Sequence, residues 1–189
     1  MRRHSSATSS RRSAGSLLLL GAAAIALCGL RAGAQAAPKP LSKTTDHLTA
    51  SAALSALSVQ PGRRLVLTMD VKPNTGMHVY APGSQYRAVA IKIADGAPFK
   101  LGAPVEYPKP ALYTFKPLNE QVLVYSQPFQ LVAQLAHDAT RAVMTPLQRP
   151  QSVTLNASLD YQACDDRVCY LPESVPFRWT VTIPPTRFP

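Results

Sequence analysis

The chain has 189 residues, of which 20 are Lys or Arg and 10 are Asp or Glu, giving a formal net charge of +10. Five arginines lie before residue 37, which leaves 15 basic and 10 acidic residues in about 150 residues, the length of one ordinary domain with a real core. These basic residues are scattered. Because nucleic-acid binding requires a basic stripe with interleaved aromatics, the composition excludes that function.

Residues 1–36 have the pattern of a secretory signal peptide. Residues 1–15 carry four arginines and no acid, residues 16–30 form an apolar run, and small residues follow at Ala34 and Ala36. The run has about 15 residues, whereas a membrane-spanning helix needs roughly 20, so we expect cleavage rather than anchoring. We therefore expect an exported protein, in which cysteines can be oxidised.

The next segments predict a linker followed by strands. Residues 37–46 are polar and rich in proline, which predicts a flexible linker. His47–Val59 is compatible with a helix or a strand, and the alternation that follows favours a first strand. Apolar residues alternate with polar ones over Leu65–Val71, and Met77–Tyr80 is a short strand between turn residues.

The second half of the chain continues the same pattern. Residues 102–120 show little periodicity and predict a long surface loop. Strict alternation surrounds that loop, over Val89–Ile93, Phe129–Leu135, Val153–Leu159 and Val175–Ile183. Residues 47–185 therefore predict a single all-β domain, an antiparallel two-sheet sandwich of roughly eight strands.

Two cysteines, Cys164 and Cys169, lie outside the signal peptide, since Cys28 falls in its apolar run. Asp165-Asp166-Arg167 predicts the tip of a hairpin whose first strand continues through Asp160–Cys164. Opposed residues in such a pair have Cα atoms about 4.5–5.5 Å apart, which overlaps the disulfide range of about 4.4–6.8 Å. A disulfide between the two cysteines is therefore feasible.

The pair could be a working redox couple or a structural staple. Closing so short a loop stabilises the fold by roughly 2 kcal/mol, and a bond near a hairpin tip is accessible and labile. A metal held with His78 or His137 is a third possibility, with copper handling through Met77 and His78 as its weaker form, although no second CxxC motif or His-rich run is present. No nucleophile elbow or triad pattern of a hydrolase is present.

The segment Tyr161-Gln162-Ala163-Cys164, followed by Cys169-Tyr170-Leu171-Pro172, resembles the N-terminal periplasmic domain of the thiol:disulfide interchange protein DsbD. That family carries a Tyr-Gln-x-Cys motif, a short spacer, and then a Cys with a nearby Pro. The segment Gly76-Met77-His78-Val79-Tyr80, followed by Pro82-Gly83, is similar to a second motif of the family. The resemblance covers residues 45–185.

The resemblance implies an immunoglobulin-like β-sandwich whose Cys164 and Cys169 cycle between dithiol and disulfide without a cofactor. Such a domain takes electrons from a membrane-embedded thiol reductase and passes them to periplasmic thioredoxin-like proteins, with cytochrome c biogenesis among the processes served. Cys169 is expected to react first with a partner. We expect a monomer and, since the chain ends at Pro189, a separate protein as electron donor. The alternative is a non-catalytic periplasmic binding domain with a structural disulfide.

The resemblance also implies roles for aromatic and polar neighbours of the cysteines. Tyr161, Gln162 and Tyr170 would shape the pocket around the couple. The family shields its cysteines with an aromatic cap loop, and Tyr113-Thr114-Phe115 lies where that cap should fall. We expect Phe115 to be the cap residue, with Tyr113 beside it. The alternative is that these rings only pack within the loop.

Overall fold

The computed structural model describes residues 38–116, 118–137 and 149–185. The predicted signal peptide, residues 1–36, lies outside this part of the chain. The described residues fall in one compact unit. Within the described ranges, no helix is long and apolar enough to cross a membrane.

The described residues form strands joined by turns. In chain order these are β1 (Leu41–Thr44), β2 (Leu48–Leu54), β3 (Arg64–Pro73), β4 (His78–Tyr80), β5 (Ala90–Ile93), β6 (Phe99–Leu101), β7 (Ala111–Phe115), β8 (Glu120–Tyr125), β9 (Phe129–His137), β10 (Gln151–Tyr161), β11 (Ala163–Cys164) and β12 (Glu173–Ile183). The longest strands coincide with the segments of strict alternation, as expected when one face of each strand is buried.

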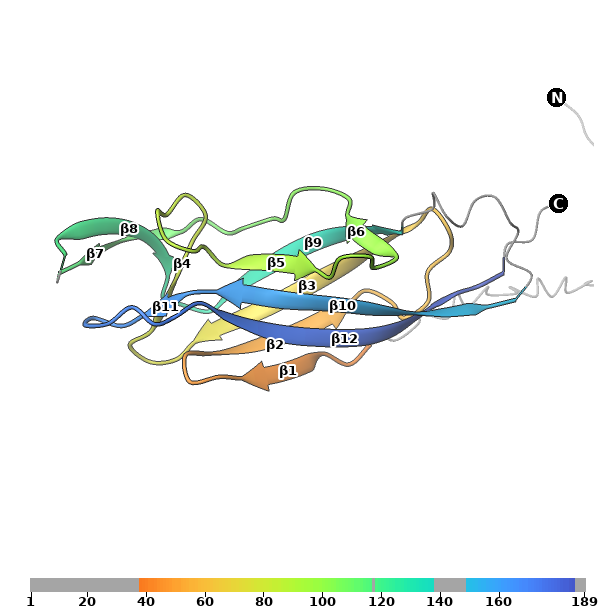
Figure 1. Ribbon diagram of the computed structural model, residues 1–189, viewed down its shortest axis with the longest axis horizontal. Coiled ribbons are helices and arrows are strands. Elements are labelled where there is room, and N and C mark those ends of the chain that lie inside the picture. Colours follow the sequence, from red (N-terminus) through yellow and green to blue (C-terminus); the bar gives the residue numbers. More distant parts are fainter. Residues whose placement is uncertain (1–37, 117, 138–148, 186–189) are drawn as a thin grey trace, which may run out of the picture. The chain divides into compact units, whose positions relative to one another are not determined.

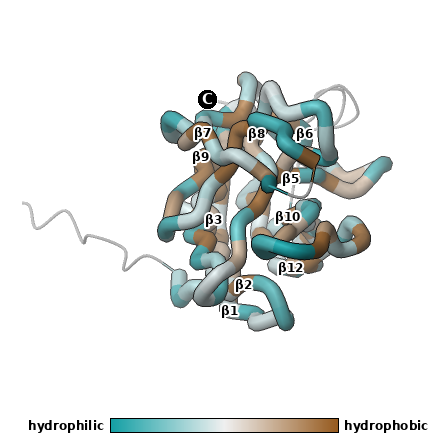
Figure 2. Tube along the Cα trace, turned by 90° about the vertical axis from the view of Figure 1, so that its left-hand side faces the viewer, coloured by the Kyte–Doolittle hydropathy of each residue, from teal (hydrophilic) through white to brown (hydrophobic). Residues whose placement is uncertain are grey.

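The strands form three sheets, and all their pairings are antiparallel. The first has the order β1-β2-β3-β9-β6, the second β12-β10-β5 and the third β11-β4-β8-β7. Seen end-on, the first sheet faces the second across the core (Figure 2). The third lies at one end of this sandwich (Figure 1). The predicted all-β, immunoglobulin-like antiparallel sandwich is confirmed.

The core lies between the first two sheets. Along β3 every second residue from Leu65 to Val71 is buried, and along β10 the same holds from Leu155 to Tyr161. Burying one Leu or Val side chain stabilises the fold by about 1.5–3 kcal/mol relative to leaving it exposed. This alternation sets the pairing register, because a slip by one residue would turn each buried row toward water.

Two predictions about irregular segments are corrected by the structure. The predicted flexible linker contains β1, which pairs with β2 from Leu41 to Thr44. The predicted surface loop at residues 102–120 contains β7, which pairs with β8. All four β1 side chains are exposed and β7 buries mainly Phe115. Without a regularly buried face, neither segment has an apolar period, so the sequence pattern did not show these edge strands.

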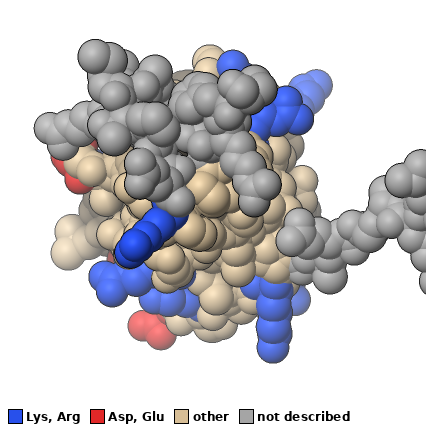
Figure 3. Space-filling view, turned by 90° about the vertical axis from the view of Figure 1, so that its right-hand side faces the viewer, with Lys and Arg blue, Asp and Glu red and all other residues tan. Residues whose placement is uncertain are grey.

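Charge is distributed in separate groups. On the described part of the end opposite the third sheet, Lys and Arg side chains are separated by neutral atoms rather than gathered in a stripe (Figure 3). This end of the domain therefore does not present a continuous cationic surface in the residues described.

Candidate functional site

The two cysteines face each other across a tight hairpin, as the sequence predicted. Cys164 and Cys169 form an antiparallel bridge, and the backbone N–H of Asp165 donates to the carbonyl of Val168 at 2.9 Å. Both cysteines are free thiols in this structure. The arrangement places the thiols next to each other, as formation of a disulfide requires.

The strand that carries Cys164 differs from the prediction in one respect. The strand before it ends at Tyr161, and β11 belongs to the third sheet, where Cys164 pairs with His78 of β4. Gln162 lies between the two strands, and its carbonyl accepts a hydrogen bond of 3.3 Å from the backbone N–H of Tyr80. The chain thus leaves the sandwich core at Gln162 and carries the cysteines to its end.

The two thiols differ in accessibility. Cys164 is fully buried, whereas Cys169 is partly exposed. Burial, followed by contact with the Cys169 thiol, raises the pKa of Cys164 to about 12. Cys164 is therefore a neutral thiol near neutral pH. Cys169 is the sulfur that a partner protein can reach.

Tyr80 contacts both sulfur atoms. Its hydroxyl oxygen lies 3.0 Å from Cys164 Sγ, which donates to it, and 3.1 Å from Cys169 Sγ. A hydroxyl carries a single hydrogen. Either atom can be the donor in the contact between Tyr80 and Cys169. Burial and the two sulfur contacts raise the pKa of Tyr80, so its hydroxyl stays protonated.

The Tyr80 ring is held by its strand and by a stacked neighbour. Gly76, at a φ of +80°, completes the turn that leads into β4. Tyr86 stacks on Tyr80 with ring centroids 4.5 Å apart, and its hydroxyl donates to Glu120 at 2.5 Å. Val122 and Val124 of β8 complete the apolar cluster around the cysteines. Tyr80 belongs to the second sequence motif, but its contact with the two sulfurs was not predicted.

Of the two predicted cap residues, Tyr113 lies against the cysteine site. It packs in the apolar cluster with Cys164 and Cys169, and its hydroxyl donates to Asp166 at 2.5 Å. Phe115 is buried at the far end of β7, and among the described residues it does not belong to that cluster. The two side chains lie on the same face of β7, and the difference is their position along it, since Tyr113 lies at the middle of the strand and Phe115 at its end.

His78 lies beneath Tyr113 and beside Cys164. Its ring is buried, with its centroid 4.3 Å from that of Tyr113, and its Nε2 atom has no hydrogen-bond partner. Burial lowers the pKa of His78, and the charges of Asp166 and Asp165 oppose that effect. His78 is therefore a neutral ring at neutral pH.

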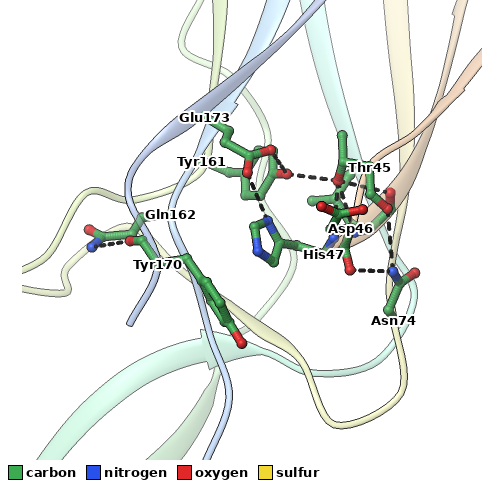
Figure 4. A network of polar contacts seen from close by, with 9 residues as sticks. Thr45, Asp46, His47, Asn74, Tyr161, Gln162, Tyr170 and Glu173 are labelled. Atoms are coloured by element: carbon green, nitrogen blue, oxygen red, sulfur yellow. Dashed lines mark hydrogen bonds and ion pairs between the residues drawn. The ribbon is translucent and has the colours of Figure 1, made fainter. Parts of the chain in front are cut away.

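The remaining predicted pocket residues brace the hairpin from its other side (Figure 4). Tyr161 is buried, and its hydroxyl donates to Glu173 at 2.7 Å. Gln162 donates through Nε2 to the carbonyl of Tyr170 at 3.0 Å. The Tyr170 hydroxyl donates to Asp165 at 2.9 Å. These contacts hold the backbone on either side of the cysteines.

Further features bear on the alternative that the cysteines hold a metal. The described residues contain no group of three or more His, Cys, Asp or Glu that could hold a metal ion. His137 packs on Phe99, with ring centroids 5.4 Å apart, at the end of a strand of the first sheet.

A groove of about 690 Å³ is lined by residues of β1, β5, β10 and β12, including Lys43, Lys92 and Arg178. The cysteines do not line this groove.

Comparison with known proteins identifies the family. The family described as "Thiol:disulfide interchange protein DsbD, N-terminal" matches residues 44–178. The search of curated proteins gave no match. Among solved structures, the N-terminal periplasmic domain of ScsB from Proteus mirabilis is similar, at 13% identity and a TM-score of 0.47. The match covers 77% of this chain and 49% of the ScsB chain.

A second similar structure is the reduced N-terminal domain of DsbD from Neisseria meningitidis. It is 17% identical, with a TM-score of 0.40, over 68% of this chain and 85% of its own. This chain spans about half the length of the ScsB structure. The family match covers most of the described domain, including both cysteines. The chain therefore belongs to the family of DsbD N-terminal domains, which is part of a thiol:disulfide interchange system.

Proposed function

We propose that this domain is a thiol–disulfide exchange protein that carries electrons on the Cys164/Cys169 pair between a membrane-embedded thiol reductase and thioredoxin-like proteins in the periplasm. One observation supports this most directly. A buried thiol and an accessible thiol lie opposite each other, and both contact the hydroxyl of Tyr80. A structural staple does not require one accessible sulfur or a shared hydrogen-bonding group.

The exchange begins at Cys169. Its thiolate attacks one sulfur of a partner disulfide, so that bond breaks, a mixed disulfide forms, and the second partner sulfur leaves as a thiolate. Cys164 then attacks Cys169 Sγ, which releases the partner as a dithiol and leaves the Cys164–Cys169 disulfide. Two electrons pass to the partner, and a thiol reductase restores the dithiol by the reverse steps.

Tyr80 contacts both sulfurs in the dithiol state. A thiolate can only accept a hydrogen bond, so when Cys169 attacks as a thiolate the Tyr80 hydroxyl is its donor. Cys164 must lose a proton before it attacks, and the partner thiolate released at the first step is the base that takes it. Tyr80 therefore holds the nucleophile at the first step, while its own hydroxyl stays protonated.

The surface around Cys169 suits a protein partner. Val168 and Leu171, which flank it in the chain, are 51% and 85% exposed. Large apolar side chains exposed together commonly mark protein contact sites. Tyr113 lies at the same place and is tied to Asp166 by a single hydrogen bond. A partner that displaces Tyr113 would reach the sulfur and the exposed apolar side chains together.

Partner capture tests the proposal. In a Cys164→Ser variant, Cys169 can attack a partner but nothing resolves the mixed disulfide, so a complex with an oxidised periplasmic thioredoxin-like domain should accumulate. The matched Cys169→Ser variant retains only the buried sulfur and should trap at least tenfold less, because the thiolate is the attacking form. Both are read on non-reducing gels. Equal capture by the two variants, or none by either, contradicts the proposal.

The rival function is a non-catalytic binding domain with a structural disulfide. The redox midpoint of the wild-type pair in glutathione buffers separates the two functions. Exchange proteins have midpoints of roughly −120 to −270 mV, whereas structural disulfides lie below about −300 mV. A midpoint in the lower range would leave the groove lined by Lys43, Lys92 and Arg178 as the place to search for a ligand.

A further inference from the structure

The turn between the two cysteines is closed by one side chain. Oδ1 of Asp165 accepts hydrogen bonds from the backbone N–H groups of Arg167 and Val168, each at 2.7 Å. The backbone N–H of Asp165 donates to the carbonyl of Val168 at 2.9 Å. Asp165 therefore bonds to the turn through both its side chain and its main chain. It directly follows the buried cysteine in the sequence.

The second oxygen of Asp165 is held by the residue that follows the other cysteine. Oδ2 accepts a hydrogen bond of 2.9 Å from the hydroxyl of Tyr170. The Tyr170 backbone is tied to the segment before Cys164, since its N–H donates to Ala163 at 2.9 Å and its carbonyl accepts from Gln162 at 3.0 Å. The Asp165–Tyr170 contact thus joins the turn between the cysteines to the residue that follows the second one.

A buried histidine from a distant part of the sequence supports the Tyr170 ring. The ring centroids of His47 and Tyr170 are 4.4 Å apart (Figure 4). His47 Nδ1 lies 3.0 Å from Glu173 Oε1, without the alignment of a hydrogen bond. The other oxygen of Glu173 accepts from Tyr161. Tyr170 therefore packs on a side chain that is itself anchored in the sandwich.

We propose that Asp165 is a positioning residue, which with Tyr170 holds Cys169 opposite Cys164 in the dithiol state and thereby stabilises the disulfide. This inference rests on the proposed function in taking the pair as one that cycles. In glutathione buffer the reaction converts the dithiol and one oxidised glutathione into the protein disulfide and two reduced glutathiones. Electrons and protons balance without a further reactant.

The direction of the effect follows from chain entropy. A disulfide holds the hairpin closed whether or not the side-chain contacts are present. In the dithiol state, loss of these contacts frees the turn, so closing the disulfide then removes more conformational freedom. The variant without Asp165 should therefore favour the dithiol more than the wild type does.

The experiment measures the ratio of disulfide to dithiol across graded glutathione buffers. Asp165→Ala should lower the equilibrium constant for disulfide formation roughly three- to tenfold, where tenfold corresponds to about 30 mV. Tyr170→Phe removes one contact and should lower it roughly two- to threefold. In the double variant, Tyr170→Phe should add nothing to Asp165→Ala, because its hydroxyl has already lost its acceptor.

Two further variants complete the design. Asp165→Asn keeps an oxygen for the turn, and its amide NH₂ group can donate to the Tyr170 hydroxyl in place of the lost acceptor, so its equilibrium constant should fall between those of the wild type and Asp165→Ala. Asp70→Asn removes the same charge from a carboxylate that contacts Gln130 on the first sheet, and it should match the wild type. Urea unfolding of each variant reports whether the fold is retained. If Asp165→Ala does not fold, Asp165→Asn and Tyr170→Phe still show whether these contacts affect the equilibrium constant for disulfide formation.

The outcomes separate this inference from the proposed function. Wild-type equilibrium constants in all folded Asp165 and Tyr170 variants would overturn the positioning role, as would additive effects in the double variant. Such results would leave partner capture by Cys164→Ser untouched. Conversely, a wild-type midpoint below about −300 mV, with no capture, would end the exchange proposal. The ratio of the equilibrium constants of the variants would still measure the role of Asp165.

Discussion

The hydroxyl of Tyr113 donates a hydrogen bond of 2.5 Å to Oδ1 of Asp166, which joins strand β7 to the tip of the cysteine hairpin. The same contact raises the pKa of Tyr113 to about 12, so the phenol remains a donor throughout the neutral range. The ring also packs on His78. We propose that Tyr113 covers the site, held there by one exposed hydrogen bond and one ring contact.

Tyr113→Phe should therefore expose the accessible thiol more often. Loss of a hydrogen bond of this type costs about 1 kcal/mol, so the alkylation rate of Cys169 by iodoacetamide should rise roughly two- to fivefold. Tyr125→Phe is the matched control, since its hydroxyl donates to the carbonyl of Pro108 instead. An unchanged rate in Tyr113→Phe would show that the hydrogen bond does not control access.

Tyr80→Phe should slow thiol–disulfide exchange. The variant keeps the ring and removes the hydroxyl that contacts both sulfurs. Hydrogen bonds to a charged group contribute about 1.5–3 kcal/mol, so the rate of attack by Cys169 should fall at least about tenfold. Stopped-flow mixing with an oxidised dithiol substrate measures it. Tyr86→Phe, whose hydroxyl contacts Glu120, should react at the wild-type rate, and equal slowing of both variants would rule out this role.

Alkylation of the buried thiol, Cys164, should depend steeply on pH. The pKa of Cys164 is raised to about 12, chiefly by burial, so on the order of one thiol in ten thousand is ionised at pH 8. In Cys169→Ser, where Cys164 remains, alkylation should therefore rise about tenfold per pH unit from 8 to 10 without levelling. The single-cysteine variant Cys164→Ser should react at least about tenfold faster at pH 8. A plateau below pH 10 for Cys164 would refute the raised pKa.

Leu159→Ala should test the sandwich core independently of the cysteines. Leu159 is fully buried in β10, where a Leu to Ala change typically costs 2–5 kcal/mol through lost burial and a cavity. The free energy of unfolding in urea should fall by roughly that amount. Val66→Ala, at an exposed position on β3, should change it by less than about 0.5 kcal/mol. Similar losses in both variants would mean that the assigned register is wrong.

The long strands were predictable because each has one buried face. Alternation over Leu65–Val71, Phe129–Leu135, Val153–Leu159 and Val175–Ile183 corresponds to β3, β9, β10 and β12. Proline within Val175–Ile183 also agrees with the edge position of β12 in its sheet. The strands β1 and β7 were missed because their side chains are mainly exposed, which leaves hydrogen bonding as the main evidence of a strand.

The candidate site also has a part that the sequence predicts and a part that it does not. Cys164 and Cys169 are close in sequence, so a hairpin places them together, and spacing was enough to predict it. The contact of Tyr80 with Cys169 joins residues 89 positions apart. That Tyr113 rather than Phe115 packs with the cysteines depends on which part of β7 lies beside them. Neither contact has a signature in local sequence.

The sequence by itself determined the alternation that builds a β-sandwich, the local turn that opposes the two cysteines, and the motifs that relate the chain to its family. Only the tertiary structure decided which thiol is buried, which phenol contacts both, and how His47, Tyr170 and Asp165 brace the turn. The physical reason is the range of the interactions. Periodicity and turns depend on neighbouring residues, whereas burial and hydrogen-bond partners depend on strands that meet only when the sheets pack.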